Sequence, residues 1–224
     1  MTDIFVIGNG PSLNRYDLNR LAGRHTFVCN RFYLYKGLTW TPTYYTAADE
    51  GVLLDYWDEV MDYAKKAERS FFPAVHPQGI DVKTLVDLPN VTFYELAWGG
   101  FFMNDGFKVG LNGTVANVMI QLAYEMGYKN IYLLGVDMSY TVNGSMTLDS
   151  NGRDMYSHGD DPNHFDPNYF GAGHHFHYPK VDLMIERLGK LARLLDDRGV
   201  KVYNLNPDSK FRNCLFADFE KVVG

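Results

Sequence analysis

Cysteine is scarce in this sequence of 224 residues, and it forms no pattern that would indicate a disulfide framework. Cys29 and Cys214 are the two cysteines, and neither belongs to a Cys-x-x-Cys motif, which favours a reducing cytoplasm. The chain also contains no apolar run near the roughly 18 residues that a membrane helix requires. It begins with a predicted strand instead of a signal peptide. We therefore expect a soluble, cytoplasmic protein with no integral membrane segment.

Positive charge is not in excess either. Lys and Arg number 21 against 27 Asp and Glu, which leaves a net charge of -6. General affinity for nucleic acid or for an anionic membrane surface is therefore not expected. Aromatic residues, in contrast, make up 15% of the chain. They suit a protein that stacks sugars or bases, and equally one with an aromatic core.

Short apolar strands alternate with amphipathic helices along the chain. Residues 130–137 form the clearest strand, because an unbroken apolar run is typical of a central parallel strand covered on both faces. The alternation predicts an α/β fold: a single Rossmann-like domain over residues 1–224 with a mainly parallel sheet. Besides a first helix that includes Leu13, Leu18 and Leu21, we expect helices over residues 48–64, 114–126 and 179–198.

The first strand, residues 4–7, leads directly into Gly8-Asn9-Gly10-Pro11-Ser12. Gly8 and Gly10 let the backbone turn sharply and approach a ligand closely, and the proline suits the first position of a helix. The free N–H groups of that helix attract an anion. The turn is a candidate phosphate cradle, and a glycine-rich turn that binds nothing is the alternative. Leu13 stands where a dinucleotide fingerprint has its third glycine, so NAD is not predicted.

Other polar residues follow predicted strands or begin helices. Asn30 and Arg31 come directly after a strand at residues 26–29, and Asp137 ends the central strand. Ligands of open parallel sheets lie outside these strand ends, which makes the three residues candidates for a binding site. For Asn30, a loop asparagine that caps backbone groups is the alternative. Thr114 or Asn112 is a natural cap for the next helix, and the N-terminus of that helix could meet a second anionic group.

Residues 139–177 show no periodicity and contain five of the seven histidines. A stretch of this length inside a compact domain is usually a functional lid or disordered, and we favour a lid. Its histidines can be interpreted in three ways. One of them could act as a general base, they could belong to an inert polar loop, or His174, His175 and His177 could bind a metal together with aspartates. The lid tyrosines are candidates to hydrogen-bond a leaving phosphate: Tyr140, Tyr156 and Tyr169.

Several blocks of the chain carry a family resemblance. They are Gly8-Asn9-Gly10-Pro11-Ser12-Leu13, Cys29-Asn30-Arg31-Phe32-Tyr33, the run from Gly127 to Asp137, His177 five residues before Asp182, and Tyr203-Asn204-Leu205-Asn206-Pro207-Asp208-Ser209. In their order and spacing the chain resembles the bacterial lipooligosaccharide sialyltransferases over nearly its whole length. Residues 164–171 are also similar to a segment of the 6-hydroxymethylpterin diphosphokinase-like proteins.

The resemblance to the sialyltransferases implies a GT-A-variant fold with a lid, a CMP-activated sugar acid as donor, a glycan acceptor, no cofactor and no metal. By position, His177 would deprotonate the acceptor hydroxyl for an inverting attack, and Tyr140 would hold the departing phosphate. The donor would meet Asn9, Ser12, Asn30 and Thr114. The family also implies self-association into a homo-oligomer.

Three positions depart from the sialyltransferase pattern. Asn112 stands in place of an arginine, Val115 in place of a serine, and Thr147 near the place of a second phosphate-binding tyrosine. These departures bear on the donor sugar more than on the fold. Another activated sugar acid therefore stays open beside sialic acid.

Two rival functions remain at this point. A diphosphokinase would move pyrophosphate from ATP to a pterin, and it would need magnesium held by carboxylates such as Asp49, Glu50 or Asp137. A non-catalytic nucleotide or glycan binder would keep the cradle without the chemistry. For Asp49 and Glu50, a favourable interaction with a helix N-terminus is the simpler alternative to metal binding.

Overall fold

The computed structural model describes residues 2–76 and 78–224. Its main feature is a nine-stranded sheet in which every strand pairs in parallel with its neighbours, in the order β12-β11-β7-β1-β2-β3-β4-β5-β6. The strands are β1 Asp3–Ile7, β2 Thr26–Cys29, β3 Tyr44–Thr46, β4 Arg69–Pro73, β5 Val91–Trp98, β6 Lys108–Leu111, β7 Asn130–Leu134, β11 Lys201–Asn204 and β12 Leu215–Phe216. The predicted α/β fold with a mainly parallel sheet is confirmed.

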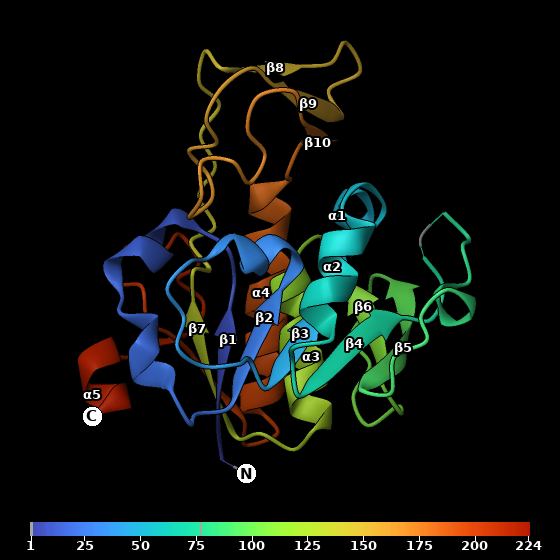
Figure 1. The fold of residues 1–224 in the computed structure, drawn as a ribbon. Coiled ribbons are helices and arrows are strands. Elements are labelled where there is room, and N and C mark those ends of the chain that lie inside the picture. The colour runs from blue at the N-terminus through green and yellow to red at the C-terminus, as the bar shows by residue number, and fades with distance from the viewer. Residues whose placement is uncertain (1, 77) are drawn as a thin grey trace.

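Helices cover both faces of this sheet (Figure 1). The α-helices are α1 Glu50–Asp55, α2 Trp57–Ala64, α3 Val115–Glu125, α4 Val181–Asp196 and α5 Phe219–Val223. Short 3-10 helices lie at η1 Pro11–Arg15, η2 Leu18–Leu21, η3 Asn30–Leu34 and η4 Val82–Thr84. No helix within the described residues combines the length and the apolar character needed to cross a membrane.

The strand β1 shows why the sheet lies between two cores. Its residues alternate, so that Ile4 and Val6 belong to one apolar cluster while Phe5 and Ile7 belong to the other. The first cluster contains the inner faces of α3 and α4, and the second contains those of α1 and α2. Because both faces are covered, residues 4–7 of the strand are all apolar, as expected for a central parallel strand.

The lid, residues 139–177, stands above the carboxyl ends of the strands (Figure 1). It differs from the expectation of a wholly irregular segment, because it contains an antiparallel sheet of β8 Met146–Leu148, β9 Asp154–Ser157 and β10 His175–His177. These strands are three or four residues long, which places one or two side chains on each face, too few for a periodic signal to emerge from the sequence. The rest of the lid is turns and loops.

Several local predictions need correction. The expected first helix is a pair of 3-10 helices, and the helix expected over residues 48–64 is divided at Tyr56 into α1 and α2. The strand β6 precedes the cap of α3 where no strand was expected. Residues 108–111 include a glycine, and their apolar and polar side chains alternate only weakly. They form a strand because they pair with β5 at the edge of the sheet, and no local pattern predicts this pairing. The predicted end of α3 is confirmed at Gly127, which has a φ of 87°.

Candidate functional site

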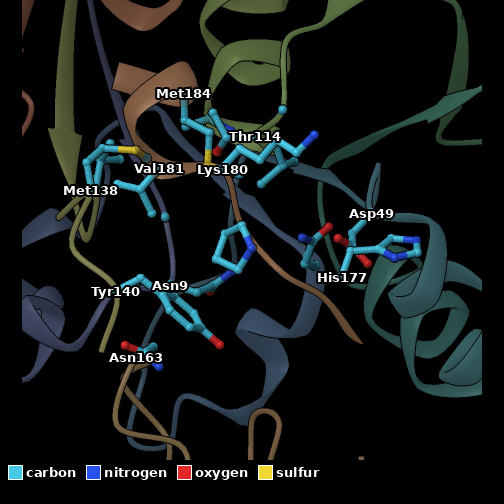
Figure 2. Close-up of a pocket in the computed structure, with 18 of the residues that line it drawn as sticks. Asn9, Asp49, Thr114, Met138, Tyr140, Asn163, His177, Lys180, Val181 and Met184 are labelled. Atoms are coloured by element: carbon cyan, nitrogen blue, oxygen red, sulfur yellow. The ribbon is translucent and has the colours of Figure 1, made fainter. Parts of the chain in front are cut away.

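A cavity of about 610 Å³ lies at the carboxyl edge of the sheet. Its lining comes from the turn after β1, the segment after β7, the start of α4 and the lid. Figure 2 shows Tyr140 and Asn163 on one side of this cavity and Thr114, Lys180 and Met184 on the other. The predicted site residues that line it are Gly8, Asn9, Gly10, Asn30, Thr114, Asp137, Tyr140, Tyr169 and His177, whereas Ser12 and Arg31 lie outside the lining.

The glycine turn after β1 is held against the end of β7. The amide of Gly8 donates to Leu134 O and that of Gly10 to Gly135 O, each over 2.8 Å. Gly10 has an ordinary φ of -66°. Glycine is needed in this turn because the backbone lies close to the segment after β7: a Cβ on Gly8 would lie 2.6 Å from the carbonyl oxygen of Gly135. The turn therefore forms part of the cavity floor through packing, and not through a left-handed backbone.

Asp137 occupies the end of η1 that was predicted to receive a ligand anion. Its Oδ2 accepts from the amide of Ser12 at 2.9 Å, its Oδ1 accepts from the Ser12 hydroxyl, and Asn206 Nδ2 donates to Oδ1 at 2.8 Å. Ser12 is buried and does not reach the cavity. In this structure the pair joins β1 to the segment after β7. The predicted contact of Ser12 with the donor stays a prediction.

Asn9 lines the cavity and contains a buried acceptor atom without a partner. Its Nδ2 donates to the carbonyl of Cys29 at 3.2 Å and to the hydroxyl of Tyr169 at 3.1 Å. Because a carbonyl can only accept, this contact places the amide nitrogen toward Cys29 and leaves Oδ1 free. That oxygen is buried and has no hydrogen-bond partner within the described chain. A buried orphan acceptor calls for a ligand that donates an N–H or O–H group.

Asn30 and Arg31 are adjacent in sequence but make different contacts. Asn30 lines the cavity with a φ of 50°, and its Oδ1 accepts from the amide of Ala48 at 3.3 Å, so the backbone-capping alternative describes part of its role. Arg31 is buried and turns away to the lid, where its guanidinium donates to the carbonyls of Tyr169 and Asn168. It also lies 3.8 Å from the centre of the Tyr56 ring. In this structure Arg31 anchors the lid.

Thr114 caps α3 as predicted. Its hydroxyl accepts from the amide of Ala116 at 3.3 Å, and the residue lines the cavity. Asp49 caps α1 in the same manner, with Oδ1 accepting from Val52 N at 3.0 Å. This contact supports the simpler interpretation of Asp49.

His177 forms a hydrogen-bonded pair with a carboxylate. Its Nδ1 lies 2.6 Å from Oδ1 of Asp154, its partner across the β9–β10 ladder. His177 lines the cavity and 60% of its side chain is exposed. A proton on Nδ1, donated to the carboxylate, leaves the Nε2 lone pair available to accept a proton. This is the arrangement that a general base requires.

Tyr140 lines the cavity, and its hydroxyl lies 3.8 Å from Met146 Sδ. Burial, and then the charge of Asp161, raise the pKa of Tyr140, and the hydrogen bond with Asn163 lowers it only in part. The group therefore stays protonated near neutral pH and can donate to an anion. Its ring packs edge-on against Tyr178, with centroids 6.1 Å apart.

The inner part of the lid is organised by Asp161. Its carboxylate accepts from His164 Nδ1 at 2.7 Å and from the amides of Asn163 at 2.8 Å and Phe170 at 3.0 Å. Burial raises the pKa of Asp161, but the hydrogen bond and charge of His164 together with the two amides outweigh burial and lower it. The His164 ring stacks on Tyr169 at 3.8 Å. This packing places the Tyr169 hydroxyl against Asn9.

The lid histidines do not come together as metal ligands. His174 Nδ1 contacts the carbonyl of Gly171 at 2.9 Å, His158 contacts Thr147, and His177 contacts Asp154. Within residues 2–76 and 78–224, no three His, Cys, Asp or Glu side chains are grouped so that they could hold a metal ion.

Sequence reasoning missed the partner of His177 and several residues that line the cavity. Asp154, the partner, was not identified, although the alternation of residues 154–157 is a weak strand signal that could have suggested its pairing. Lys180 and Arg187 of α4 were overlooked because they were assigned to a helix without a functional face. Trp98 lines the cavity and is 76% exposed. It belongs to the loop that was interpreted as covering either a ligand or the core.

No family model and no curated protein matches this sequence, but solved structures match its fold. The sialyltransferase CstII from Campylobacter jejuni, in complex with the substrate analogue CMP-3FNeuAc, is 17% identical with a TM-score of 0.54, over 96% of this chain and 86% of that chain. The monofunctional alpha-2,3-sialyltransferase Cst-I from the same organism is 18% identical with a TM-score of 0.57, over 96% and 79% of the two chains.

A further solved glycosyltransferase structure matches the fold of this chain. The MAf glycosyltransferase from Magnetospirillum magneticum AMB-1 is 18% identical with a TM-score of 0.53, over 96% of this chain and 33% of that chain. At these identities the likeness establishes the fold. The resemblance noted from the sequence blocks is therefore confirmed at the level of architecture.

Proposed function

We propose that this protein is a metal-independent, inverting glycosyltransferase that moves a sialic acid-like sugar from a CMP-activated donor to a glycan acceptor. The observation that carries the proposal is the His177–Asp154 pair, which lies at the wall of a cavity whose floor holds the orphan acceptor of Asn9. The fold shared with CstII, whose complex contains CMP-3FNeuAc, supports this choice of donor.

The reaction needs one proton transfer and one displacement. Nε2 of His177 takes the proton of the acceptor hydroxyl as the oxygen attacks the anomeric carbon of the donor sugar. The bond from that carbon to the phosphate oxygen breaks, and CMP leaves with the electron pair. Attack on the face opposite the leaving group inverts the anomeric configuration. The protonated hydroxyl of Tyr140 donates a hydrogen bond to the departing phosphate.

The nucleotide would lie over the glycine turn. Asn9 Oδ1 would accept from the cytosine amine or a ribose hydroxyl, which satisfies its unpaired lone pairs. Asn30 and Thr114 would contact the donor from the ends of β2 and β6. We assign Gly8 and Gly10 to close backbone approach, Tyr169 to holding Asn9, and Asp137 and Ser12 to the shape of the turn.

A thermal-shift panel tests the donor. CMP, CDP, UDP, GDP and ATP would each be added with magnesium and with EDTA. A ligand that binds the folded state raises apparent stability by about 2.7 kcal/mol at a hundredfold excess over its dissociation constant. We expect stabilisation by CMP or CDP that survives EDTA. Stabilisation by ATP with magnesium alone would instead identify the diphosphokinase.

The variant His177→Ala separates an enzyme from a non-catalytic binder. Removing the base should lower turnover about 10²- to 10⁴-fold while CMP still binds. The matched control is His175→Ala, since His175 lies on the same strand and does not line the cavity. If the His177 variant keeps wild-type turnover, the general-base assignment is wrong.

The remaining parts of the proposal concern the whole chain. We propose that residues 1–224 act as one domain, that the protein works in the cytoplasm, and that it assembles as a homo-oligomer. Sedimentation velocity across a range of concentrations tests the assembly. A single monomeric species at micromolar concentration would contradict it.

A further inference from the structure

Most of the carboxylates that line the cavity have hydrogen-bond partners, whereas its lysine and arginine have no ion-pair partner within the described residues. Among the described lining residues the carboxylates are Asp49, Glu50 and Asp137, and the lysine and arginine are Lys180 and Arg187. Asp49 is engaged in capping α1, and Asp137 is engaged with Ser12 and Asn206. Neither Lys180 nor Arg187 has an ion-pair partner within residues 2–76 and 78–224. Two cations therefore line the cavity without an ion-pair partner, beside one carboxylate, Glu50, that no described contact engages.

Lys180 and Arg187 lie on one face of α4. Lys180 is the residue before the helix, and Arg187 follows seven residues later, close to two full turns at about 3.6 residues per turn. Met184 lies between them on the same face and also lines the cavity. The guanidinium of Arg187 is suited to a bidentate contact with a carboxylate, and the flexible ammonium of Lys180 can approach the same group.

The cations and the proposed phosphate site lie on different walls. Figure 2 shows Lys180 with Thr114 and Met184 across the cavity from Tyr140 and Asn163. The proposed leaving phosphate lies at Tyr140, so the charge on α4 is left for a second anionic group of the donor. The orphan Oδ1 of Asn9, buried in the same cavity, independently indicates a bound ligand.

We infer that Lys180 and Arg187 bind the carboxylate of the donor sugar, which makes the chain selective for an activated sugar acid over a neutral activated sugar. The inference rests on the proposed function, since it takes the donor to be CMP-linked. It assigns a binding role to the face of α4 that lines the cavity.

Two ligands separate the carboxylate from the phosphate. CMP carries its negative charge on the phosphate, whereas CMP-3FNeuAc carries one charge on a phosphodiester and one on the sugar carboxylate. Calorimetric titration of wild type, Lys180→Gln and Arg187→Gln with both ligands measures the contribution of each cation. Arg193→Gln is the matched control, because Arg193 lies in the last turn of α4 and does not line the cavity.

For Arg187→Gln we expect the dissociation constant of CMP-3FNeuAc to rise roughly 10- to 100-fold, as for loss of a charge-assisted contact. Lys180→Gln should produce a smaller rise, and CMP affinity should change little in either variant. An equal loss for both ligands would assign the cations to the phosphate and overturn the inference. Unchanged affinity for both ligands would overturn it as well.

The same titrations distinguish this inference from the proposed function. If wild type binds neither CMP nor CMP-3FNeuAc, the CMP-linked donor is wrong and the inference is wrong with it. If wild type binds both ligands and the α4 variants behave as Arg193→Gln does, the inference alone is wrong. Circular dichroism of each variant establishes that α4 remains folded.

Discussion

The floor of the cavity and the lid above it are held in place by different interactions. The floor, formed by β1, β7 and the glycine turn, is largely buried and joined by five parallel residue pairs between Asp3–Ile7 and Asn130–Leu134. The lid is attached through few contacts, among them Phe165 N to Asn9 O at 2.9 Å and the bonds from Arg31. The floor is therefore shaped by packing before any ligand arrives. The lid depends on a small number of anchors, so local opening should be easiest there.

The interiors of the two regions differ as well. Beneath the sheet edge the contacts are buried aliphatic and aromatic side chains, which Phe165 and Tyr169 of the lid join. The rest of the lid is held by hydrogen bonds to Asp161 and by stacked rings such as Phe170 on Phe176, with centroids 4.5 Å apart. Packing resists a change of volume, and a hydrogen-bond network responds to a change of charge. The predictions below test these two sensitivities.

The largest effect should come from filling the floor. In Gly10→Ala the new Cβ would lie 2.8 Å from Gly135 O and against the Asp137 carboxylate, so the turn must shift away from β7. We expect a loss of about 3 kcal/mol in the free energy of unfolding. Gly144→Ala in the lid, where a Cβ meets nothing within 4 Å, should cost less than about 0.5 kcal/mol. Urea unfolding measures both, and equal losses would contradict the comparison.

Removing a lid anchor should loosen the lid more than the sheet. Arg31→Gln leaves the carbonyls of Tyr169 and Asn168 without their donor, at a cost of about 2 kcal/mol. We expect faster proteolytic cleavage within residues 139–177. Arg15→Gln is the control, since Arg15 forms a solvent-exposed pair with Asp208, and such pairs contribute little to stability. Cleavage sites spread over the whole chain would show that Arg31 stabilises the fold generally.

Within the lid, Asp154→Asn tests the orientation of the proposed base. The side-chain amide of the new asparagine has no negative charge and accepts the Nδ1–H of His177 less strongly than the carboxylate does. Turnover should therefore fall roughly 10- to 100-fold, less than in the variant that lacks the base. Affinity for CMP should stay the same. Nitrogen-15 NMR of the imidazole adds a readout independent of activity, because the Nδ1-protonated tautomer should dominate only in wild type. Asp160→Asn, at an exposed lid position, should alter neither measurement.

The smallest effect is the response of the lid to acid. The pKa of Asp161 is lowered in the folded protein, where burial is outweighed by His164 and two amides. Its stabilisation is therefore complete above the unfolded value of about 3.9 and declines as pH falls through the lower folded value. Hydrogen exchange of the Phe170 amide should quicken over that range while β1 amides stay protected. Asp161→Asn should remove this pH dependence.

Much of the fold follows from local patterns in the sequence. The apolar run at residues 130–134 predicts a central strand, and Thr114 and Gly127 mark the ends of α3, because each signal depends on neighbours within a few residues. The glycine turn after β1 and the position of the lid were predictable for the same reason. The resemblance to the sialyltransferases was likewise visible in short sequence blocks, and the structural match to CstII agrees with it at the level of the fold.

The contacts that define the site were decided by the tertiary structure. Ser12 faces Asp137 across 125 positions, and Arg31 reaches Tyr169 across 138. No periodicity specifies such partners, since they depend on how the sheet places two strand ends side by side. Local chemistry determined which residues were able to bind and react. Long-range packing decided that Asp154 would hold His177 and that α4 would direct Lys180 and Arg187 toward the same cavity.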